Sequence, residues 1–530
     1  MNRIFKISLQ IFLFLAIYAL AFGARVYWIN QKAGLHEDEG ISMALSSYRE
    51  YFWDQNFESN QPYTGQEAQD LSLIPSDISV SSAFQDIGRL WRDSRDPPHT
   101  NLYYSFLRLA FINFPSFDMQ EAILRGTRLN LIFFTLSFIF FFLFLRHVFP
   151  QSKLFQYAGL FCAFLSTAGI SNTLFLRPYQ LQEALFIIFI FCAVKLMRAE
   201  KLPPLIFPLS LITALTLLSG YYAIILVVLF GIYLIIDSIK EGTQERIKFY
   251  AVIFGISLVI AQVLYLRYIQ GFFSYRATEI PRTLFQFFID NTLVSFMELS
   301  WMMHRHYFAL PGILLCVVLF CSNRFLYKKF SFGLPGVVLL ISLIYISLAM
   351  LSAPYKLLRY AMPMFPFLIL IPLCFLESLE LQGRKKLFTI AAIAVLCFGF
   401  LLPLRDQSKV EHLYLTKGDN YIFIDEPDIP VLIMNRSLWR YADLVPYFNK
   451  EQVYYFFDSP DDIFPYLNDY GEVFVIIEMA QPYIRVINNM PFAVDGYPVR
   501  FFAHFKLHLP PDFPLEDFIE RGQNPGSPSS

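Results

Sequence analysis

The chain has 530 residues, of which 56% are hydrophobic, 18% aromatic and only 16% charged. Soluble globular proteins carry about 25% charged residues, so this composition excludes an ordinary soluble protein and indicates a polytopic membrane protein. The formal net charge of -1, with basic residues only in short clusters, gives no electrostatic attraction for nucleic acid and excludes that partner.

Apolar runs of bilayer-spanning length recur through the first 404 residues. A transmembrane helix needs about 17 to 25 mainly apolar residues, and about eleven runs meet that length. The first run follows Arg3 and Lys6 and has no clear small-x-small cleavage site, so we expect a retained helix, with a signal peptide as the alternative. The predicted spans cover residues 7–29, 124–146, 154–173, 181–198, 203–219, 221–237, 247–269, 307–323, 334–352, 358–378 and 386–404.

Basic residues predict the orientation of these spans, because Lys and Arg accumulate in short cytoplasmic loops. One set of alternate loops is rich in basic residues, whereas the opposite loops hold isolated ones such as Arg177, Lys356 and Arg359. We therefore expect a multi-pass protein of the cell membrane, the inner membrane in a bacterium. Its N-terminus would be cytoplasmic and its C-terminal domain periplasmic or extracellular.

The long loop at residues 30–122 opens on an acidic cluster, Glu37-Asp38-Glu39, directly after the first span. Farther along, residues 82–91 and 102–114 space their apolar side chains as amphipathic helices do, and both are too short or too polar to span a bilayer. We expect both to lie in the membrane interface. The alternative for residues 102–114, a true span, would invert every later loop and break the pattern of basic residues.

The composition becomes mixed after Arg405. Strand-like and helix-like runs alternate there, which predicts a small α/β domain with a mainly parallel sheet. The chain thus divides into a helical transmembrane domain at residues 1–404, which includes the loop at 30–122, an extracytoplasmic α/β domain at 405–520 and a disordered tail at 521–530. The strand-like runs are 431–434, 453–457, 473–477 and 501–507, and the helix-like runs are 438–448 and 461–467.

Four groups of polar residues fall on the predicted outer face. Each has a simpler explanation: a solvated charge run, a capped helix start, an arginine that snorkels, or interfacial anchors. Together, however, they supply carboxylates, one histidine and several cations, as a reaction with a phosphate leaving group requires. The groups are Glu37, Asp38 and Glu39; Asp96, His99 and Tyr103 in DPPHTNLYY; Arg177 and Tyr179 in FLRPYQ; and Lys356, Arg359 and Tyr360 in PYKLLRYAMPMFP.

The order of these motifs resembles that of the GT-C glycosyltransferases, and most of all the protein O-mannosyltransferase and lipid A aminoarabinose transferase superfamily. The resemblance covers about residues 5–400. It rests on an acidic pair after the first helix (Asp38-Glu39), an H-P-P-L-Y-Y-like segment (His99 to Tyr104), an outer A-R-x-Y-like turn (Leu176 to Tyr179) and a late R-Y-x-x-P segment (Arg359 to Pro363).

The resemblance implies an inverting transfer of a sugar from a polyprenyl-phosphate donor to a hydroxyl acceptor at the outer face of the membrane. Asp38 matches the general base, and Glu39 is its neighbour. Arg177 and Arg359 match residues that hold the lipid phosphate, with Tyr179, Lys356 and Tyr360 beside them. His99 matches a histidine of the interfacial helix, with no role fixed.

The chain also departs from the family pattern. The two prolines that usually follow the histidine are Thr100 and Asn101 here, and Pro97 and Pro98 precede it instead. Glu37 adds a third carboxylate, which could raise the pKa of a neighbour or help to bind a divalent cation. No cofactor is required, since Arg and Lys side chains can stabilise a phosphate leaving group.

Two other functions remain as alternatives. A transporter or flippase of a lipid-linked sugar would have polar residues at mid-membrane and internally repeated halves, and neither is evident in the sequence. The α/β domain could instead be a binding module on a membrane anchor, but about eleven spans exceed what an anchor needs. The expected partners are the lipid bilayer, a polyprenyl-phosphate sugar, and a glycan, lipid or protein acceptor.

Overall fold

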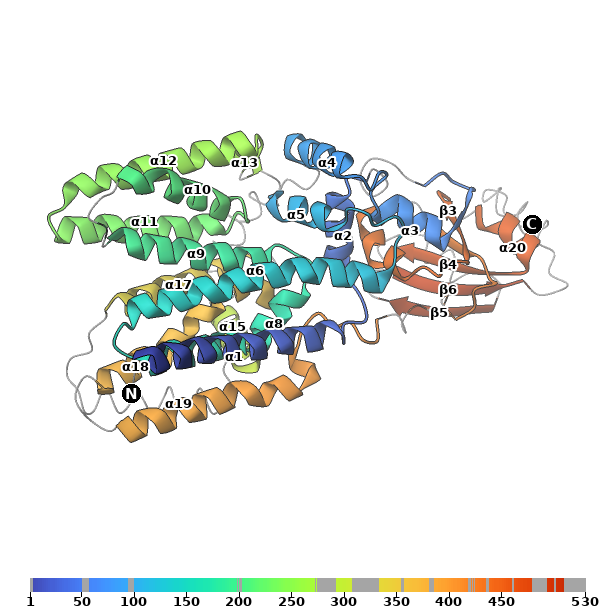
Figure 1. The fold of residues 1–530 in the computed structure, drawn as a ribbon. Coiled ribbons are helices and arrows are strands. Elements are labelled where there is room, and N and C mark those ends of the chain that lie inside the picture. Colours follow the sequence, from blue (N-terminus) through green and yellow to red (C-terminus); the bar gives the residue numbers. More distant parts are fainter. Residues whose placement is uncertain are drawn as a thin grey trace. The chain divides into compact units, whose positions relative to one another are not determined.

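The protein is described here from a computed structural model, shown in Figure 1. Its residues separate into two compact units. The membrane unit comprises residues 1–32, 87–110 and 124–413, and the sheet unit comprises residues 33–86, 111–123 and 414–530. The structure describes residues 3–49, 57–93, 100–197, 199, 203–271, 273, 292–306, 333–353, 357–380, 386–417, 421, 423, 425–434, 438–459, 462–478, 493–499 and 502–509.

The membrane unit is helical, and several of its apolar helices are long enough to cross a bilayer. Among the described residues, six helices can span a membrane by length and composition, or seven if the bent pair α7 (Lys153–Phe164) and α8 (Thr167–Leu174), with its 51° bend, is one span. The chain is therefore a multi-pass membrane protein. The six are α1 (Arg3–Ile29), α6 (Met119–Val148), α9 (Tyr179–Met197), α11 (Ala223–Lys240), α12 (Gln244–Leu264) and α17 (Leu334–Ser352).

The predicted count of about eleven spans is not confirmed. Three predicted spans coincide with apolar helices of 10–17 residues, at Pro203–Leu217, Met362–Glu377 and Thr389–Arg405. Proline is one reason why the second of these segments is not a long α-helix. Pro363 and Pro366 lie in a 3-10 stretch, η3 (Met362–Ile369), because proline lacks the N–H that an α-helix needs. The predicted span at 307–323 lies outside the described residues.

Shorter elements complete the membrane unit. In the bundle, α9 packs against α10, and α11 packs against α12 and α17 (Figure 1). Helix α9 also packs against η3. The remaining elements are α5 (Leu102–Ala110), η1 (Pro203–Leu205), α10 (Ile206–Leu217), α13 (Tyr268–Gly271), α15 (Thr292–His306), η2 (Leu358–Tyr360), α18 (Leu370–Glu380), α19 (Lys386–Leu401), η4 (Leu402–Arg405) and η5 (Gln407–Lys409).

Both amphipathic segments of the first loop are helices. The segment predicted at 82–91 is α4 (Val80–Arg92), and the one predicted at 102–114 begins as α5. With nine residues α5 is far too short to cross a bilayer, so the alternative of an additional span there is wrong. The two helices are tied together, because Asn101 Nδ2 donates to Leu90 O at 2.7 Å and Trp91 Nε1 donates to Ser105 Oγ at 2.6 Å.

The sheet unit contains a six-stranded sheet in the order β1-β3-β2-β4-β6-β5. The predicted mainly parallel sheet is corrected to a mixed one, because among the described strands the β2–β3 and β2–β4 pairs are parallel and the other three pairs are antiparallel. The C-terminal hairpin of β5 and β6 adds antiparallel pairs at one edge, as does β1 at the other. The strands are β1 (Pro62–Thr64), β2 (Val431–Met434), β3 (Val453–Phe457), β4 (Glu472–Glu478), β5 (Ala493–Val499) and β6 (Phe502–His508).

The first loop contributes directly to this sheet. Strand β1 pairs antiparallel with β3, with Tyr63 opposite Tyr454, and the ring of Phe57 stacks on that of Phe456 at 4.0 Å between centroids. The predicted boundary between residues 404 and 405 assigned this loop to the transmembrane domain. In the structure most of it folds with the C-terminal residues, because their backbone hydrogen bonds and aromatic contacts are shared.

Short helices fill the rest of the sheet unit. The helix-like run at 438–448 forms two 3-10 helices, with Pro446 at the start of the second, and the run at 461–467 becomes α20. The helices are α2 (Glu37–Ser46), α3 (Gly65–Leu73), η8 (Leu438–Asp443), η9 (Val445–Tyr447) and α20 (Ile463–Tyr470). The predicted disordered tail at 521–530 lies outside the described residues.

A buried histidine makes the sheet unit sensitive to acid. His504 on β6 is 1% exposed, and its ring stacks against those of Tyr421 and Phe423 at 5.7 and 5.8 Å between centroids. Neither ring nitrogen has a hydrogen-bond partner among the described residues. Burial lowers the pKa of His504 from 6.5 to about 4, because the charged imidazolium would lose its hydration.

We therefore expect the sheet unit to lose stability as the pH falls below 6.5. Above that pH the ring is neutral in both states; below it the unfolded chain binds a proton that the folded chain refuses until about pH 4, so unfolding is favoured. Between pH 7 and pH 5 the loss is about 2 kcal/mol. Hydrogen exchange of the β4 and β6 amides, corrected for intrinsic rates, measures it.

The variant His504→Phe should abolish this part of the pH dependence. The control is Tyr455→Phe on β3, which removes a hydroxyl bonded to that of Tyr470 and no group that titrates between pH 5 and pH 7, so the dependence should remain as it is. An unchanged pH profile in His504→Phe would show that another group is responsible.

Candidate functional site

The acidic cluster forms the first turn of α2, in the sheet unit. His36 is the N-cap: its Nδ1 accepts the N–H of Asp38 at 3.1 Å, and the Oε2 of Glu39 accepts the N–H of His36 at 2.7 Å. This reciprocal pair is a capping box, and the three carboxylates that follow His36 are favoured by the partial positive charge at a helix N-terminus. The acidic run is therefore a helix start and not a solvated loop.

The three carboxylates have different surroundings. Glu39 is completely buried, and its carboxylate accepts the hydrogen bond that closes the capping box. Glu37 and Asp38 are partly exposed. The geometry thus gives Glu39 a structural role in α2, whereas Glu37 and Asp38 are accessible for chemistry.

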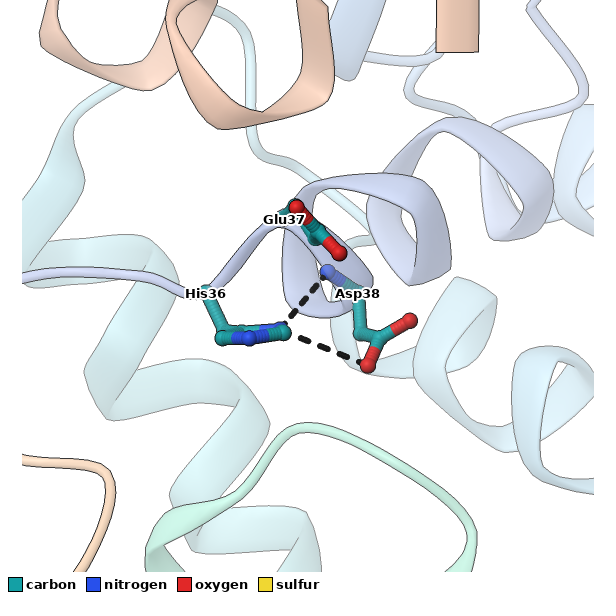
Figure 2. A group of neighbouring side chains, drawn as sticks. All are labelled: His36, Glu37 and Asp38. Carbon is teal, nitrogen blue, oxygen red and sulfur yellow. Dashed lines mark hydrogen bonds and ion pairs between the residues drawn. The ribbon is translucent and has the colours of Figure 1, made fainter. Parts of the chain in front are cut away.

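His36 and Asp38 interact through side chains as well. The Nδ1 of His36 lies 3.3 Å from Oδ2 of Asp38 (Figure 2). A single ring nitrogen cannot both accept the Asp38 N–H and donate to the carboxylate. In the capping geometry this nitrogen is therefore the acceptor of the Asp38 N–H.

The same turn contains a possible set of metal ligands. His36, Glu37 and Asp38 each offer one ligand atom, and these atoms lie within 4.8 Å of one another (Figure 2). One imidazole nitrogen and two carboxylate oxygens form a donor set that divalent cations such as Mn²⁺ or Zn²⁺ accept. The residues present thus fit a divalent cation.

The membrane unit holds the predicted cationic residues. Arg177 lies in the turn between α8 and α9 and is only 3% exposed. Its Nη1 donates to the hydroxyl of Tyr104 on α5 at 3.0 Å, and its guanidinium carbon lies 5.9 Å from the centroid of the same ring. Burying an arginine is costly unless its guanidinium has partners. The contacts with Tyr104 therefore indicate a specific buried position for Arg177, and its side chain does not snorkel to the interface.

The second predicted arginine lies beside the same turn. The guanidinium carbon of Arg359 is 5.7 Å from the ring centroid of Phe175 and 5.5 Å from that of Tyr360. The ring of Tyr179 stacks on Phe175 and meets Tyr360 edge-on at 6.1 Å. The structure thus brings Arg359, Tyr360 and Tyr179 together around Phe175, which is two residues from Arg177.

Buried polar contacts hold this turn in place. Asn130 on α6 donates from Nδ2 to the backbone carbonyls of Thr173 and Phe175, at 3.0 and 2.9 Å. The hydroxyl of Tyr103 donates to Oδ1 of Asn130 at 3.3 Å. Tyr103 therefore supports the turn through Asn130, and its neighbour Tyr104 is the tyrosine that contacts Arg177.

A further network lies behind the turn, inside the bundle. Arg25 on α1 donates from Nε to Thr173 Oγ1 at 2.9 Å, and that hydroxyl donates to Oε1 of Gln180 at 2.7 Å. Gln180 in turn donates to Glu183 at 2.9 Å. Arg25 and Glu183 are both almost fully buried, and buried charges of this kind in membrane proteins usually have a functional or positioning role.

Three predicted site residues cannot be placed. Asp96, His99 and Lys356 lie outside the described residues. The structure also identifies residues that the sequence did not suggest. His36 is the N-cap, although histidine is an unusual cap, and Asn130 holds the turn that precedes Arg177. His412 stacks on Phe175 at 4.0 Å with a φ of 71°, and no local sequence pattern marks it.

Comparison with known proteins identifies the fold. No protein-family model and no curated protein matches the chain. ArnT from Cupriavidus metallidurans bound to undecaprenyl phosphate aligns with a TM-score of 0.50 at 11% identity, over 93% of this chain and 97% of ArnT. Its apo state aligns with a TM-score of 0.50 at 10% identity, over 94% and 98%.

An oligosaccharyltransferase from Archaeoglobus fulgidus in complex with Zn and sulfate aligns more weakly, with a TM-score of 0.45 at 12% identity over 88% of this chain and 72% of that one. At these identities the likeness to ArnT concerns the fold. It confirms the GT-C-type fold, with transmembrane helices and an α/β domain, that the sequence resemblance implied.

The capping role of His36 is testable apart from any activity. His36→Ala removes the side-chain acceptor for the Asp38 N–H, so we expect α2 to lose about 1 kcal/mol and its first amides to exchange several-fold faster. His36→Asn retains an acceptor and should restore protection. The control is Ser152→Ala, which removes the cap of α7 and should leave exchange in α2 unchanged.

Proposed function

We propose that this chain, which has the fold of ArnT, is an inverting glycosyltransferase that moves a sugar from a polyprenyl-phosphate donor to a hydroxyl acceptor at the outer face of the cytoplasmic membrane. The observation that carries the proposal is the alignment with ArnT over 93% of this chain, because the solved ArnT binds undecaprenyl phosphate. A shared fold alone does not fix an activity. The residues of both units support the proposal further.

The carboxylates of α2 suit proton transfer. In the proposed reaction Asp38 takes the proton of the acceptor hydroxyl as its oxygen attacks the anomeric carbon of the sugar. The bond between that carbon and the phosphate oxygen breaks, and polyprenyl phosphate leaves with the electron pair. Attack from the side opposite the leaving group inverts the anomeric centre. Asp38 is partly exposed, whereas Glu39 is committed to the capping box, which favours Asp38 as the base.

The arginines of the membrane unit suit the leaving group. A guanidinium binds phosphate oxygens through paired hydrogen bonds and stays charged in a partly buried place. Arg359 lies beside the rings of Phe175 and Tyr360. Arg177 is two residues from Phe175 and contacts Tyr104. In the proposed reaction the two arginines bind the donor phosphate and neutralise the charge that develops as it departs.

A divalent cation is an optional part of the proposal. His36, Glu37 and Asp38 would each hold it through one ligand atom, which would leave the second carboxylate oxygen of Asp38 for the acceptor proton, and the cation would add positive charge to the site. The acceptor is a glycan, a lipid such as lipid A, or a protein, and each offers the hydroxyl that the reaction needs.

Replacing the base tests the reaction. Asp38→Asn removes the proton acceptor while keeping the size of the side chain, so transfer should fall by a factor of at least about 100. The assay incubates purified protein with a panel of polyprenyl-phosphate sugars and follows donor consumption. Asp118→Asn is the matched control, because Asp118 is likewise an aspartate at a helix N-terminus, where its carboxylate accepts the N–H of Glu121 on α6, and it should leave turnover unchanged.

Near-normal turnover in Asp38→Asn would exclude this residue as the base. If the wild-type protein consumes no donor but moves a labelled lipid-linked sugar across the membrane, the alternative of a transporter or flippase replaces the proposal.

Removing the arginines tests donor binding. Arg177→Met and Arg359→Met should each raise KM for the donor by about tenfold or more, because a charge-assisted contact with phosphate contributes about 1.5–3 kcal/mol. Arg246→Met is the control, because Arg246 donates to the backbone carbonyls of Met197 and Ala199 and belongs to a predicted cytoplasmic loop. Equal KM values in all three variants would contradict the phosphate-binding role.

A further inference from the structure

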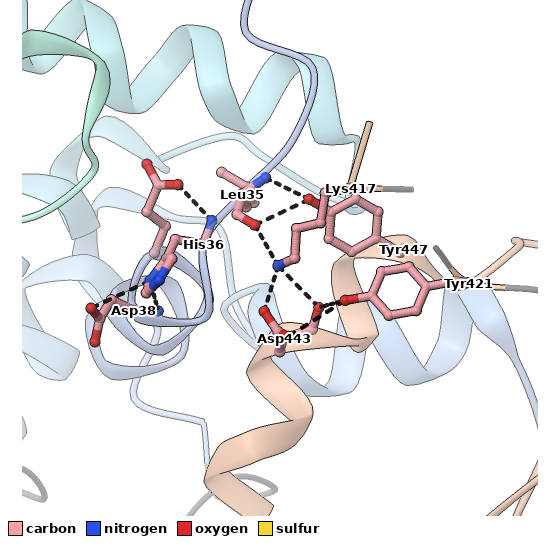
Figure 3. A network of polar contacts seen from close by, with 8 residues as sticks. Leu35, His36, Asp38, Lys417, Tyr421, Asp443 and Tyr447 are labelled. Atoms are coloured by element: carbon pink, nitrogen blue, oxygen red, sulfur yellow. Dashed lines mark hydrogen bonds and ion pairs between the residues drawn. The ribbon is translucent and has the colours of Figure 1, made fainter. Parts of the chain in front are cut away.

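The residue before the N-cap of α2 is held by the C-terminal half of the sheet unit. Both backbone groups of Leu35 meet one hydroxyl: Leu35 N donates to Tyr447 Oη at 2.9 Å, and that hydroxyl donates to Leu35 O at 3.1 Å. Lys417 Nζ also donates to Leu35 O, at 2.7 Å (Figure 3). Leu35 is fully buried, and both its N–H and its carbonyl are hydrogen-bonded, so this residue has little freedom to move.

Lys417 is itself fixed by a buried ion pair. Its ammonium contacts the carboxylate of Asp443, which is 1% exposed, and the hydroxyl of Tyr421 donates to the backbone carbonyl of Asp443 at 3.1 Å (Figure 3). Removing one partner of such a pair leaves a buried charge without compensation. The position of Lys417 therefore depends on Asp443, and that of the Leu35 carbonyl depends in part on Lys417.

The helix that follows is packed against the same region. Helix α2 contacts η8, and a Cβ atom added at Gly40 would lie 2.5 Å from the carbonyl oxygen of Ala442, next to Asp443. A Cβ at Gly34 would lie 2.3 Å from the hydroxyl of Tyr447. Both glycines thus allow the backbone to approach Ala442 and Tyr447 more closely than a residue with a side chain could. The start of α2 is therefore held in one position against these residues.

We infer that Lys417, Asp443 and Tyr447 are positioning residues, which hold the first turn of α2 so that the Asp38 carboxylate is placed for proton transfer. The inference rests on the proposed function, since it takes Asp38 as the base. Asp38 is three residues from Leu35, and a displacement of a reacting group by about 1 Å can lower a rate by about 100-fold. These three residues belong to the C-terminal α/β domain, so the role of that domain is to support the catalytic carboxylate.

The variant Tyr447→Phe tests this assignment, because it deletes one hydroxyl and keeps the ring. We expect kcat to fall by about 10- to 100-fold while KM for the polyprenyl-phosphate donor stays within about threefold of wild type. Hydrogen exchange should quicken in α2 and stay slow in β2 and β4. Lys417→Met should behave alike, and Lys417→Arg, which keeps the charge, should recover part of kcat.

The matched control is Tyr455→Phe. The hydroxyl of Tyr455 bonds that of Tyr470 at 2.7 Å in the same unit, so this variant loses a comparable hydrogen bond without touching Leu35, and its kcat should match that of wild type. If Tyr455→Phe lowers kcat as much as Tyr447→Phe, the effect is one of general stability and the inference fails.

The remaining outcomes separate this inference from the proposed function. If wild type transfers sugar and Asp38→Asn does not, but Tyr447→Phe has the kcat of wild type, the proposed function stands and the positioning role is overturned. A raised donor KM with unchanged kcat would also overturn it, because the cluster would then bind substrate. If Tyr447→Phe does not fold, Lys417→Met decides: a lowered kcat with unchanged KM supports the role, and a wild-type kcat rejects it.

Discussion

The pairing of β1 with β3 is the interaction on which the organisation of the sheet unit depends. Three residues of the first loop, Pro62 to Thr64, add an edge strand to a sheet whose other strands come from the end of the chain. Their hydrogen bonds are supported by the stacking of Phe57 on Phe456. Because this contact fixes the loop on the sheet, it also brings α2 and α3 within reach of η8 and η9.

Patterns that depend on neighbouring residues could be predicted from the sequence. Strands β2 and β3 have the predicted bounds, since continuous apolar runs between turn residues mark buried strands. Strand β5 escaped prediction because AVDGYPV contains both glycine and proline, which are unfavourable in strands. Strand β1 escaped for another reason: its three residues carry no periodic signal, and only a partner far along the chain makes them a strand.

The residues of the candidate site also differ in whether the sequence reveals them. The acidic run and the two arginines stand out as charged residues next to apolar helices, and the structure gives each of them a defined place. The residues that hold them do not stand out. Asn130 and His412 are single polar or aromatic residues whose importance comes from a contact in space. No local pattern records such a contact, so a sequence alone names the charges and omits their supports.

The discontinuous sheet unit has a consequence for how the protein is made. Its two main parts, residues 33–86 and 414–530, are separated in the chain by most of the membrane unit. Domains generally fold as units during synthesis, in order from the N-terminus. Here α2 emerges early, yet its partners η8 and Tyr447 leave the ribosome only after the helices between them. The acidic turn thus acquires its final surroundings only after the residues of the membrane unit have been synthesised.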